Sequence, residues 1–538
     1  MYPSADNEDG VKDPMEILED ALVLCTFGRF HIRLLLTTMA ASCASMIVTT
    51  TTSYIVPNAE CDLNMTIIEK GLLTSMPFFG QVSCSLIAGF VTDAFGRKRF
   101  LVGGFFGIFI CAVIEGSSQT FWMLAIAKLL AGVCSCFCFT IPVVLLSELV
   151  HKHVRDRVLL INASFMSISL ITIAFISWGL LPLQLDITVI EGYFVLHSWN
   201  IYLYVCSIFS LIAAISYYYL PESPKFLLSH GQENKALEIM KDIYQSNTRN
   251  HRDTFPITSL NASGSYVPTT KDTFKRQIVN ALLEVKNLFR PPLRGRLCLF
   301  CIITFVCLLA YSSLRMWYPQ ISTMVENYQQ THNRTDRFCA MITEYTQEKL
   351  NYEQKIDGIL NPPIGSNLTV SELDANDTEI CVPHISGTET YTNGILLGFV
   401  SFIGIGISTY VVKFFGVKPL MIFLLIICGA CSASLYWTNS LISMAILIST
   451  TCGFMQTAMS LEYNLLMRAF PTTLRTLSVS IITMIGRIGS LLGSILFPVM
   501  LTYGCMTPFI ALSVLSLAIT SLVYFLPSPS DKNHTGDK

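Results

Sequence analysis

The chain has 538 residues, of which 52% are hydrophobic and only 13% are charged, and its mean hydropathy is +0.54. A soluble core of this size could not bury so much apolar surface, so the composition excludes an ordinary soluble globular protein. The net charge of −2 says little about partners, because in a membrane protein the placement of charge matters more than its sum.

Apolar runs that cross a bilayer need about 20 residues each. The sequence contains about twelve such runs, which predicts an all-α membrane protein with twelve transmembrane helices. The expected spans are 30–56, 69–92, 100–117, 121–147, 158–183, 198–220, 297–319, 393–415, 418–437, 441–464, 477–500 and 502–526.

Basic residues crowd alternate loops along the chain, whereas the short loops near 118, 184–197, 438 and 503 carry none. The positive-inside rule therefore predicts that the basic loops and both termini are cytosolic. The first 29 residues are acidic and lack the layout of a cleavable secretory signal, so the first span is expected to direct insertion.

A long polar connection after the sixth span divides the chain into two halves. The expected order is a cytosolic N-terminus (1–29), a six-helix bundle (30–220), a cytosolic loop with amphipathic helices (221–296), the seventh span (297–320), a glycosylated luminal or extracellular loop (321–392), the remaining five spans (393–526) and a cytosolic tail (527–538).

The long segment after the seventh span lies on the side that the charge bias makes luminal or extracellular. Asn333, Asn367 and Asn376 each begin an Asn-X-Thr sequon there, which predicts glycosylation. Cys339 and Cys381 lie in the same segment, where an oxidising compartment leaves two outcomes open, a disulfide between them or two free thiols.

An internal repeat supports the division into halves. The segment LLSELVHKHVRDR at 145–157 aligns with LLMRAFPTTLRTL at 465–477 at an offset of 320 residues (468 − 148). The same offset places Gly96 on Gly416 and Lys98 on Lys418. Two loops that share one offset indicate parallel repeats about an axis along the membrane normal, as in one large class of transporters.

The loop motifs resemble those of the major facilitator superfamily. The segment GFVTDAFGRKRF at 89–100 carries that superfamily's most characteristic pattern, and Glu148 with Arg155, PESPK at 221–225 and Pro471 with Arg475 agree further. GRF at 28–30, HSW at 197–199 and MWYP at 316–319 are similar to the synaptic vesicle glycoprotein 2 family and its related-protein branch. The resemblance implies that two six-helix halves rock about a midplane cavity and carry a small polar or charged organic solute.

Several positions depart from that family. Ser45 and Val48 occupy first-span positions where relatives carry acids, Tyr463 replaces an acid beside Glu462, and Lys413 and Val417 degrade the second loop motif. These departures leave the coupling ion open. They also favour an alternative function. In this alternative the chain is a transporter-like vesicle glycoprotein that moves no solute and acts by ligand binding, trafficking or partner contacts.

The loop at 89–99 has two interpretations. Its bases alone would serve as a positive-inside anchor. Gly89, Asp93, Gly96, Arg97 and Lys98 together favour a conformational latch, in which the aspartate meets the positive N-terminal end of the eleventh span and Arg97 pairs with an acid of a neighbouring helix.

Charges within spans are candidates for function, because an ionisable group in the bilayer is costly. Arg487 either faces the central cavity or pairs with Glu462 or another helix, and Arg315 could extend to the interface. The expected cavity residues are Trp178, Tyr311, Glu462, Tyr463 and Arg487, with packing as the alternative for the aromatics. The expected gating or helix-clamping residues are Lys128, Glu148, Arg155 and Arg475.

The sequence contains no nucleotide-binding glycine loop, zinc-ligand spacing or nucleophile elbow, so we expect neither an enzyme nor a cofactor or metal site. The expected partners are a small organic solute and the lipid bilayer, and no nucleic acid. The expected location is a vesicle, endomembrane or plasma membrane.

Overall fold

A computed structural model describes residues 14–183, 185–190, 193–260, 288–291, 293–332, 336–347, 387–470 and 472–526. The first group of long helices comprises α2 (Arg29–Asn58), α3 (Ile67–Phe95), α4 (Arg97–Gly116), α5 (Phe121–Phe139), α6 (Ile141–Leu149), α7 (Lys152–Leu180) and α8 (Ser198–Tyr219). The second group comprises α12 (Leu293–His332), α14 (Thr388–Phe415), α15 (Val417–Ser434), α16 (Leu441–Ala469), α17 (Thr472–Thr502) and α18 (Met506–Tyr524).

The described residues contain 11 helices that are long and apolar enough to span a membrane, with α5 and α6 counted as one. The helix α3, of 29 residues, completes the set and packs between α5 and α17. The expected helical membrane fold is therefore confirmed: 11 of the twelve expected spans have the length and hydropathy of a membrane helix, and α3 is assigned as the twelfth from its length and its position in the bundle. Several boundaries differ by a few residues, and the largest difference is at α12, which runs to His332, well past the expected end of the seventh span at 320.

Local sequence explains where several helices begin. The Thr66 hydroxyl accepts a hydrogen bond from the Glu69 amide, and the Glu69 carboxylate accepts one from the Thr66 amide, so the two residues form a capping box for α3. At the start of α5 the Thr120 hydroxyl accepts a hydrogen bond from the Met123 amide, without the reciprocal bond. The break between α5 and α6 falls at Thr140, just before Pro142, whose ring cannot continue a helix without losing a backbone bond.

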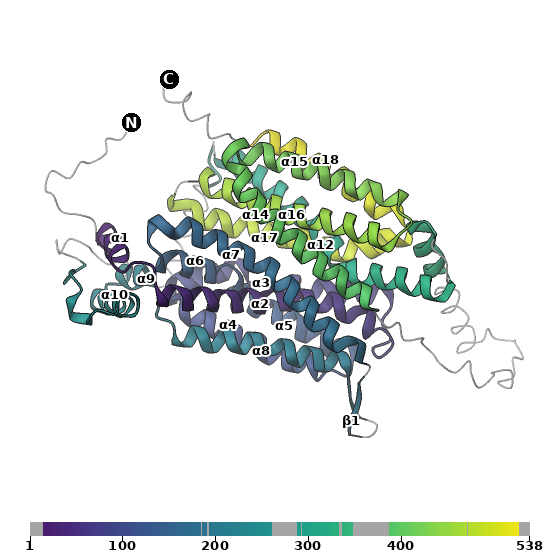
Figure 1. Cartoon of the computed structure of the whole chain (residues 1–538), viewed down its shortest axis with the longest axis horizontal. Coiled ribbons are helices and arrows are strands. Elements are labelled where there is room, and N and C mark those ends of the chain that lie inside the picture. Colours follow the sequence, from purple (N-terminus) through teal and green to yellow (C-terminus); the bar gives the residue numbers. More distant parts are fainter. Residues whose placement is uncertain are drawn as a thin grey trace, which may run out of the picture.

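The two groups of helices lie side by side, with the first group in purple to teal and the second in green to yellow (Figure 1). The short helices α1 (Pro14–Leu24), α9 (Pro224–Ser229) and α10 (Glu233–Thr248) gather at one end of the bundle, shown at the left of Figure 1. We call this the cytosolic end, as the charge bias predicts, and the opposite end the outer end.

The outer halves of the two groups pack closely against each other. The space beside Gly394 of α14 is filled by the Tyr54 hydroxyl of α2 and by Ala174 of α7. The ring of Pro498 in α17 lies against Gly71 of α3. Because any side chain larger than glycine would collide at Gly394, these close approaches are built into the sequence.

A disulfide fastens the outer end of the second group. Cys339 is bonded to Cys505, with the two Cα atoms 5.5 Å apart, so the expectation of a Cys339–Cys381 disulfide is wrong. Residues 336–347 fold back over the bundle, where the Phe338 amide donates to the Thr438 carbonyl. This contact brings Cys339 to the short turn between α17 and α18, which the sequence alone did not associate with the outer loop.

Other expectations for the outer loop fall outside the described residues. These are the sequons at Asn333, Asn367 and Asn376 and the partner thiol Cys381. Cys61, in the loop between α2 and α3, is also disulfide-bonded. Because the three sequons lie outside the described residues, glycosylation stays a prediction.

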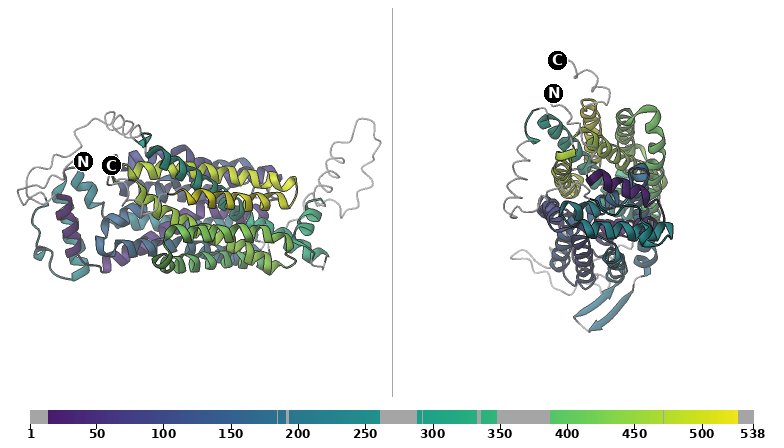
Figure 2. Two further views of the ribbon diagram at one scale, coloured as in Figure 1. Left: turned by 90° about the horizontal axis from the view of Figure 1, so that it is seen from above. Right: turned by 90° about the vertical axis from the view of Figure 1, so that its left-hand side faces the viewer.

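Two short strands interrupt the helical pattern at the outer end. The strands β1 (Asp186–Ile190) and β2 (Phe194–His197) pair antiparallel as a hairpin between α7 and α8. The hairpin projects sideways from the first group, across the direction of the helices, in Figure 1 and again in the end-on view of Figure 2.

Candidate solute cavity and gating contacts

Arg315 of α12 reaches from the second group to α2 of the first. Its guanidinium donates to the Thr50 hydroxyl at 2.9 Å and to the Thr49 hydroxyl at 3.5 Å. The side chain is only 8% exposed, and its Nε atom has no hydrogen-bond partner. The expectation that Arg315 extends to the membrane interface is therefore wrong, because the side chain points inward to the boundary between the groups.

Tyr311 lies one helical turn before Arg315 on the same helix. Its ring centroid is 5.4 Å from the guanidinium carbon of Arg315, within cation–π range. Its hydroxyl lies 3.4 Å from the Oε1 atom of Gln456 on α16. The predicted residue Tyr311 thus belongs to a polar cluster with Arg315, Gln456, Thr49 and Thr50, at the boundary between the two groups.

Arg487 of α17 also reaches the first group. Its guanidinium lies 3.5 Å from the Cys136 sulfur and 5.4 Å from the centre of the Phe139 ring, both on α5. Neither Arg315 nor Arg487 has an ion-pair partner among the described residues. The alternative in which Arg487 pairs with Glu462 is wrong.

Glu462 lies inside the second group, away from Arg487. Its carboxylate accepts a hydrogen bond from the Thr304 hydroxyl of α12, and the side chain is 3% exposed. The neighbouring backbone of α17 approaches closely, because a Cβ atom on Gly486 would meet Leu308 and Thr304. The carboxylate therefore contacts a helix-packing interface and not the Arg315 cluster.

The remaining two predicted cavity residues are not joined to the Arg315 cluster by any contact in the described part of the chain. Trp178 lies near the outer end of α7, is 42% exposed and packs against Phe175. Tyr463 is half-buried and packs on the apolar core of the second group. Their role in binding a solute stays a prediction.

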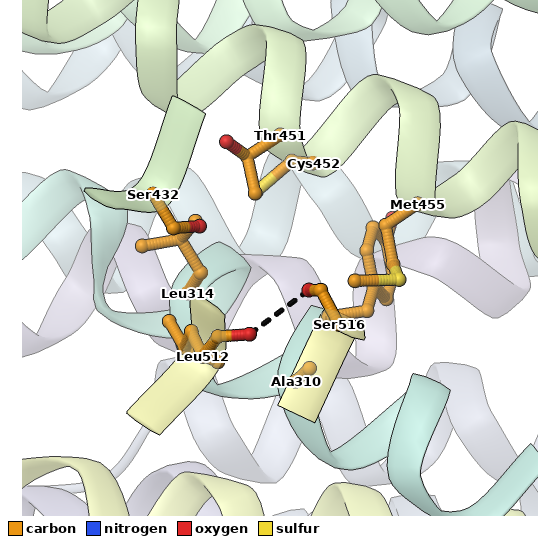
Figure 3. Close-up of a pocket in the computed structure, with 9 residues that line it drawn as sticks. Ala310, Leu314, Ser432, Thr451, Cys452, Met455, Leu512 and Ser516 are labelled. Carbon is orange, nitrogen blue, oxygen red and sulfur yellow. Dashed lines mark hydrogen bonds between the residues drawn. The ribbon is translucent and has the colours of Figure 1, made fainter. Parts of the chain in front are cut away.

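Two hollows in the described structure do not suit an organic solute. The first, of about 10 Å³, lies between α12, α15, α16 and α18 and is drawn in Figure 3. It has room for no more than one water molecule, near the unpartnered hydroxyl of Ser432. The second, of about 620 Å³, lies between α12, α17 and α18, and its walls are almost wholly apolar.

Lys128 of α5 is fully buried in an ion pair. Its ammonium lies 2.7 Å from the Glu115 carboxylate of α4 and donates to the Thr51 hydroxyl of α2 at 2.9 Å. The two side chains are 0% and 4% exposed. Because neither charge is solvated by water, each is stabilised mainly by the other. Through the ion pair and the Thr51 hydrogen bond, Lys128 joins three helices of the first group. This geometry fits the expected structural role of Lys128.

The loop between α3 and α4 is organised around Gly96, whose φ of +97° favours glycine. The backbone amides of Arg97 and Lys98 donate to the Glu222 carboxylate at 3.1 to 3.2 Å, so the acid caps the start of α4. Arg97 forms an ion pair with Glu148 of α6. The side chain of Asp93 and the surroundings of Gly89 lie outside the described residues, so the latch role stays a prediction.

The residues expected to clamp helices have partners that sequence reasoning did not identify. Glu148 also accepts a hydrogen bond from the Ser223 hydroxyl. Arg155 pairs at 2.8 Å with Glu19 of α1, and Lys225 pairs with the same carboxylate at 2.6 Å. The side chain of Arg475 lies outside the described residues.

Sequence reasoning also missed Glu115, Glu222, Glu19 and the inward direction of Arg315. A partial signal existed for Glu115, because an acid in an apolar span needs a partner wherever its side chain does not reach water. No group of three or more potential metal ligands gathers among the described residues.

Comparison with known sequences supports the resemblance. The sequence profile described as "Major Facilitator Superfamily" matches residues 37–335 and 353–538. The chain is 22% identical over 315 residues to synaptic vesicle glycoprotein 2B of Rattus norvegicus, covering 55% of this chain and 46% of that protein. It is 22% identical over 481 residues to the putative transporter svop-1 of Caenorhabditis elegans, covering 88% and 78%.

Another relative is myo-inositol transporter 1 of Saccharomyces cerevisiae, 26% identical over 278 residues, with 49% of this chain and 46% of that protein covered. The chain thus spans about half the length of several curated relatives that it matches.

Among solved structures, the partially occluded inward-open conformation of the xylose transporter XylE from E. coli superposes with a TM-score of 0.62 at 12% identity, covering 93% of this chain and 100% of that one. At this identity the likeness shows the fold. Together with the sequence profile, which covers most of the chain, these findings establish that the chain belongs to the Major Facilitator Superfamily, with relatives in the synaptic vesicle glycoprotein 2 group.

Proposed function

We propose that this protein carries a small polar organic solute across a membrane by alternating access, and that an anionic group on the solute is favoured. The observation that carries the proposal is the pair of arginines at the boundary between the helix groups. Arg315 and Arg487 both extend from the second group to the first, and neither has a carboxylate partner among the described residues.

An uncompensated cation inside a membrane is costly, so a pair of them is retained for a purpose. A guanidinium presents a planar fork of donors that matches a carboxylate or a vicinal pair of hydroxyls. The Nε atom of Arg315 has no protein partner, which leaves a buried donor for such a ligand. Thr49, Thr50 and Gln456 add hydroxyl and amide groups around the same point.

The packing between the groups supports alternating access. The close approaches of Gly394 to Tyr54 and of Gly71 to Pro498 lie in the outer halves of their helices, so the outer side of the boundary is closed. A solved structure with the same fold is in a partially occluded inward-open conformation. Arg315 would then contact a solute at the closed end of an inward-facing cavity, with Arg487 nearer the cytosolic end, and rocking of the groups would expose the solute to the other side.

The names of the relatives support the solute class. Proteins named for the transport of myo-inositol and xylose share the fold or part of the sequence. Polyols offer many hydroxyls to arginine and glutamine, and sugar acids or inositol phosphates would add an anionic group for the two arginines, which have no carboxylate partner among the described residues. We therefore expect a solute of polyol size.

The test is uptake into proteoliposomes of full-length protein, with and without a pH gradient. The panel contains myo-inositol, xylose, a sugar acid, an inositol phosphate and small dicarboxylates. We expect saturable uptake of at least one solute, and a loss of about 10-fold or more in Arg315→Ala or Arg487→Ala, since each removes a charged hydrogen bond worth roughly 1.5–3 kcal/mol. Arg290→Ala, at an exposed cytosolic position, is the matched control.

Two outcomes would contradict parts of the proposal. If correctly folded wild-type protein moved no solute in the panel, the transport function would be refuted. If uptake occurred but Arg315→Ala and Arg487→Ala behaved like Arg290→Ala, the transporter would stand and the assignment of the cavity would fail. Asp93→Asn tests the latch separately, because it should change the rate of uptake without changing which solute is chosen.

A second function is favoured by specific residues. Ser45 and Val48 stand where relatives have first-span acids, and Val417 replaces a loop arginine. Loss of these groups is what a protein that has stopped transporting would show, and the likeness to synaptic vesicle glycoprotein 2B fits a vesicle protein of this kind. Solute binding to purified protein, with no uptake from either side of the membrane, would support this function.

A further inference from the structure

The hairpin between α7 and α8 has one apolar and one polar face. In the strand register, Ile187 lies opposite Leu196, and Ile190 lies opposite Phe194. Alternate residues of β2 share a face, so these four apolar side chains lie together. A bulge at Val189 makes this possible, because it moves Ile190 onto the face of Ile187.

The opposite face carries Asp186 with His197 and Thr188 with Val195. The His197 ring lies 2.7 Å from the Asp186 carboxylate and 3.8 Å from that of Asp62, in the loop between α2 and α3. Because this loop joins the outer ends of two spans, the polar face is turned toward the aqueous side. The apolar face lies on the opposite side of the hairpin from these carboxylates.

The base of the hairpin is firmly attached to the bundle. Gln119, between α4 and α5, donates to the Val195 carbonyl at 2.9 Å and accepts from the Val195 amide at 3.3 Å. The Ser198 hydroxyl accepts a hydrogen bond from the Leu185 amide at 2.6 Å. Gln119 thus pairs with β2 as a neighbouring strand would, and holds the hairpin at a fixed angle to the helices.

The exposed fractions show that protein does not cover the apolar face of β1. Ile187 is 48% exposed and Ile190 is 57% exposed, and Tyr193 at the tip is 85% exposed. The hairpin begins and ends at the outer ends of two membrane helices and projects sideways from them (Figure 2). This direction places it along the surface of the bilayer beside the first group.

We propose that the hairpin is a lipid-binding paddle that lies in the headgroup region of the outer leaflet, with Ile187, Ile190, Phe194 and Leu196 against the acyl chains. An open strand edge cannot lie in the hydrocarbon core, where its amides would lose their hydrogen bonds, whereas headgroups and water can satisfy it. A tyrosine at the tip suits the same depth. The paddle would hold the first group at a fixed height in the outer leaflet while the second group moves.

The experiment uses full-length protein in phosphatidylcholine vesicles and a matched pair of reporter variants, Ile190→Trp on the apolar face and Thr188→Trp on the polar face. Each emission spectrum is compared with that of wild type, which supplies the background of five tryptophans. We expect bromine on the acyl chains to quench the added indole of Ile190→Trp about two-fold more than that of Thr188→Trp, and aqueous acrylamide to show the reverse order, as for an interfacial amphipathic element.

Two outcomes would overturn the proposal. If acrylamide quenched the added indoles of both variants equally and brominated lipid quenched neither, the hairpin would stand in water. If the added indole of Ile190→Trp resisted both quenchers, a protein surface such as a second copy of the chain would cover it. A third measurement guards against misfolding: Ile187→Asp with Ile190→Asp should weaken thermal stability in vesicles but not in detergent, whereas Thr188→Asp should change neither. Neither test depends on solute movement.

Discussion

The loops that follow α3 and α14 are built on the same backbone but carry different charges. Gly96 and Gly416 both end a long helix with positive φ, +97° and +83°. In each loop a lysine then lies over a tyrosine of the last helix in its group, Lys98 at 5.7 Å from the ring centre of Tyr218 and Lys418 at 5.4 Å from that of Tyr524. The internal repeat is therefore visible in side-chain contacts as well as in sequence.

The two loops differ in the charged contacts that their residues make. In the first, Arg97 pairs with Glu148, and Glu222 caps the helix start. In the second, Val417 replaces the arginine, and Lys418 donates to the Leu526 carbonyl. The glycine and the lysine thus suffice for the turn, and the acidic network is an added layer that only the first loop has in the described part of the chain.

The same contrast holds within the membrane. In the first group Lys128 is neutralised by Glu115, whereas in the second Glu462 is bonded to a hydroxyl and Arg315 reaches across to the first group. The first group is braced by its own ion pairs. The second group presents its charges to packing interfaces and to the boundary, where a solute could meet them.

The largest expected effect is that of Glu115→Gln, compared with the equally isosteric change Glu462→Gln in the second group. Glu115→Gln leaves the buried Lys128 without an anion, which should cost roughly 3–5 kcal/mol in the free energy of unfolding. Glu462→Gln keeps an acceptor for the Thr304 hydroxyl and should cost less than about 1 kcal/mol. Thermal unfolding of both variants in the same detergent measures the difference, and equal losses would refute the contrast between the groups.

The next effect is conformational. Arg97→Ala removes the ion pair with Glu148 and should shift the balance between inward- and outward-facing states by about 1–3 kcal/mol. Val417→Ala, at the equivalent site of the second loop, should shift it by a few tenths at most. Spin-label distances between the cytosolic ends of α4 and α15 report the populations. The charge exchange Arg97→Glu with Glu148→Arg should restore the wild-type populations. If it did not, the ion pair between these residues would not be what sets the conformational balance.

A smaller effect distinguishes the two glycines. A Cβ atom on Gly96 would lie 2.7 Å from the Glu222 carboxylate, but on Gly416 it would meet only Pro419, at 3.9 Å. Gly96→Ala should therefore cost the strain of positive φ, about 1–2 kcal/mol, and also displace the acidic cap. Gly416→Ala should cost the strain alone. Comparable uptake rates in the two variants would show that the cap has no part in the cycle.

How much the sequence could predict follows from the range of the interactions. Hydropathy, loop bases and the repeat predicted the helices and the family, because these signals are local or periodic. They could not show that Arg315 points inward, since a residue near a span end can face either way. They also could not pair Cys339 with Cys505, or bring Glu19 to Arg155, because these contacts join segments that only the folded chain brings together.

The smallest expected effect tests a further layer of charge on the cytosolic end of the first group. Glu19 of α1 lies between Arg155 and Lys225. Burial raises the pKa of Glu19, but the hydrogen bonds and charges of Lys225 and Arg155 outweigh it, so the pKa is lowered from the ordinary 4.5. A lowered pKa stabilises the attachment of α1 above pH 4.5, and this contribution is lost as the pH falls through the folded value.

We therefore expect α1 to exchange its amide hydrogens faster, relative to the intrinsic rate, at about pH 4 than at about pH 7. Glu19→Gln should raise exchange at neutral pH by a few-fold, since a partly exposed ion pair contributes about 1 kcal/mol or less, and should flatten the pH dependence. Glu16→Gln, on the exposed side of the same helix, is the control and should leave both unchanged. If Glu19→Gln kept the full pH dependence, a group other than Glu19 would attach α1. The acidic network of the first group would then consist of the contacts around Arg97 and Glu148, without Glu19.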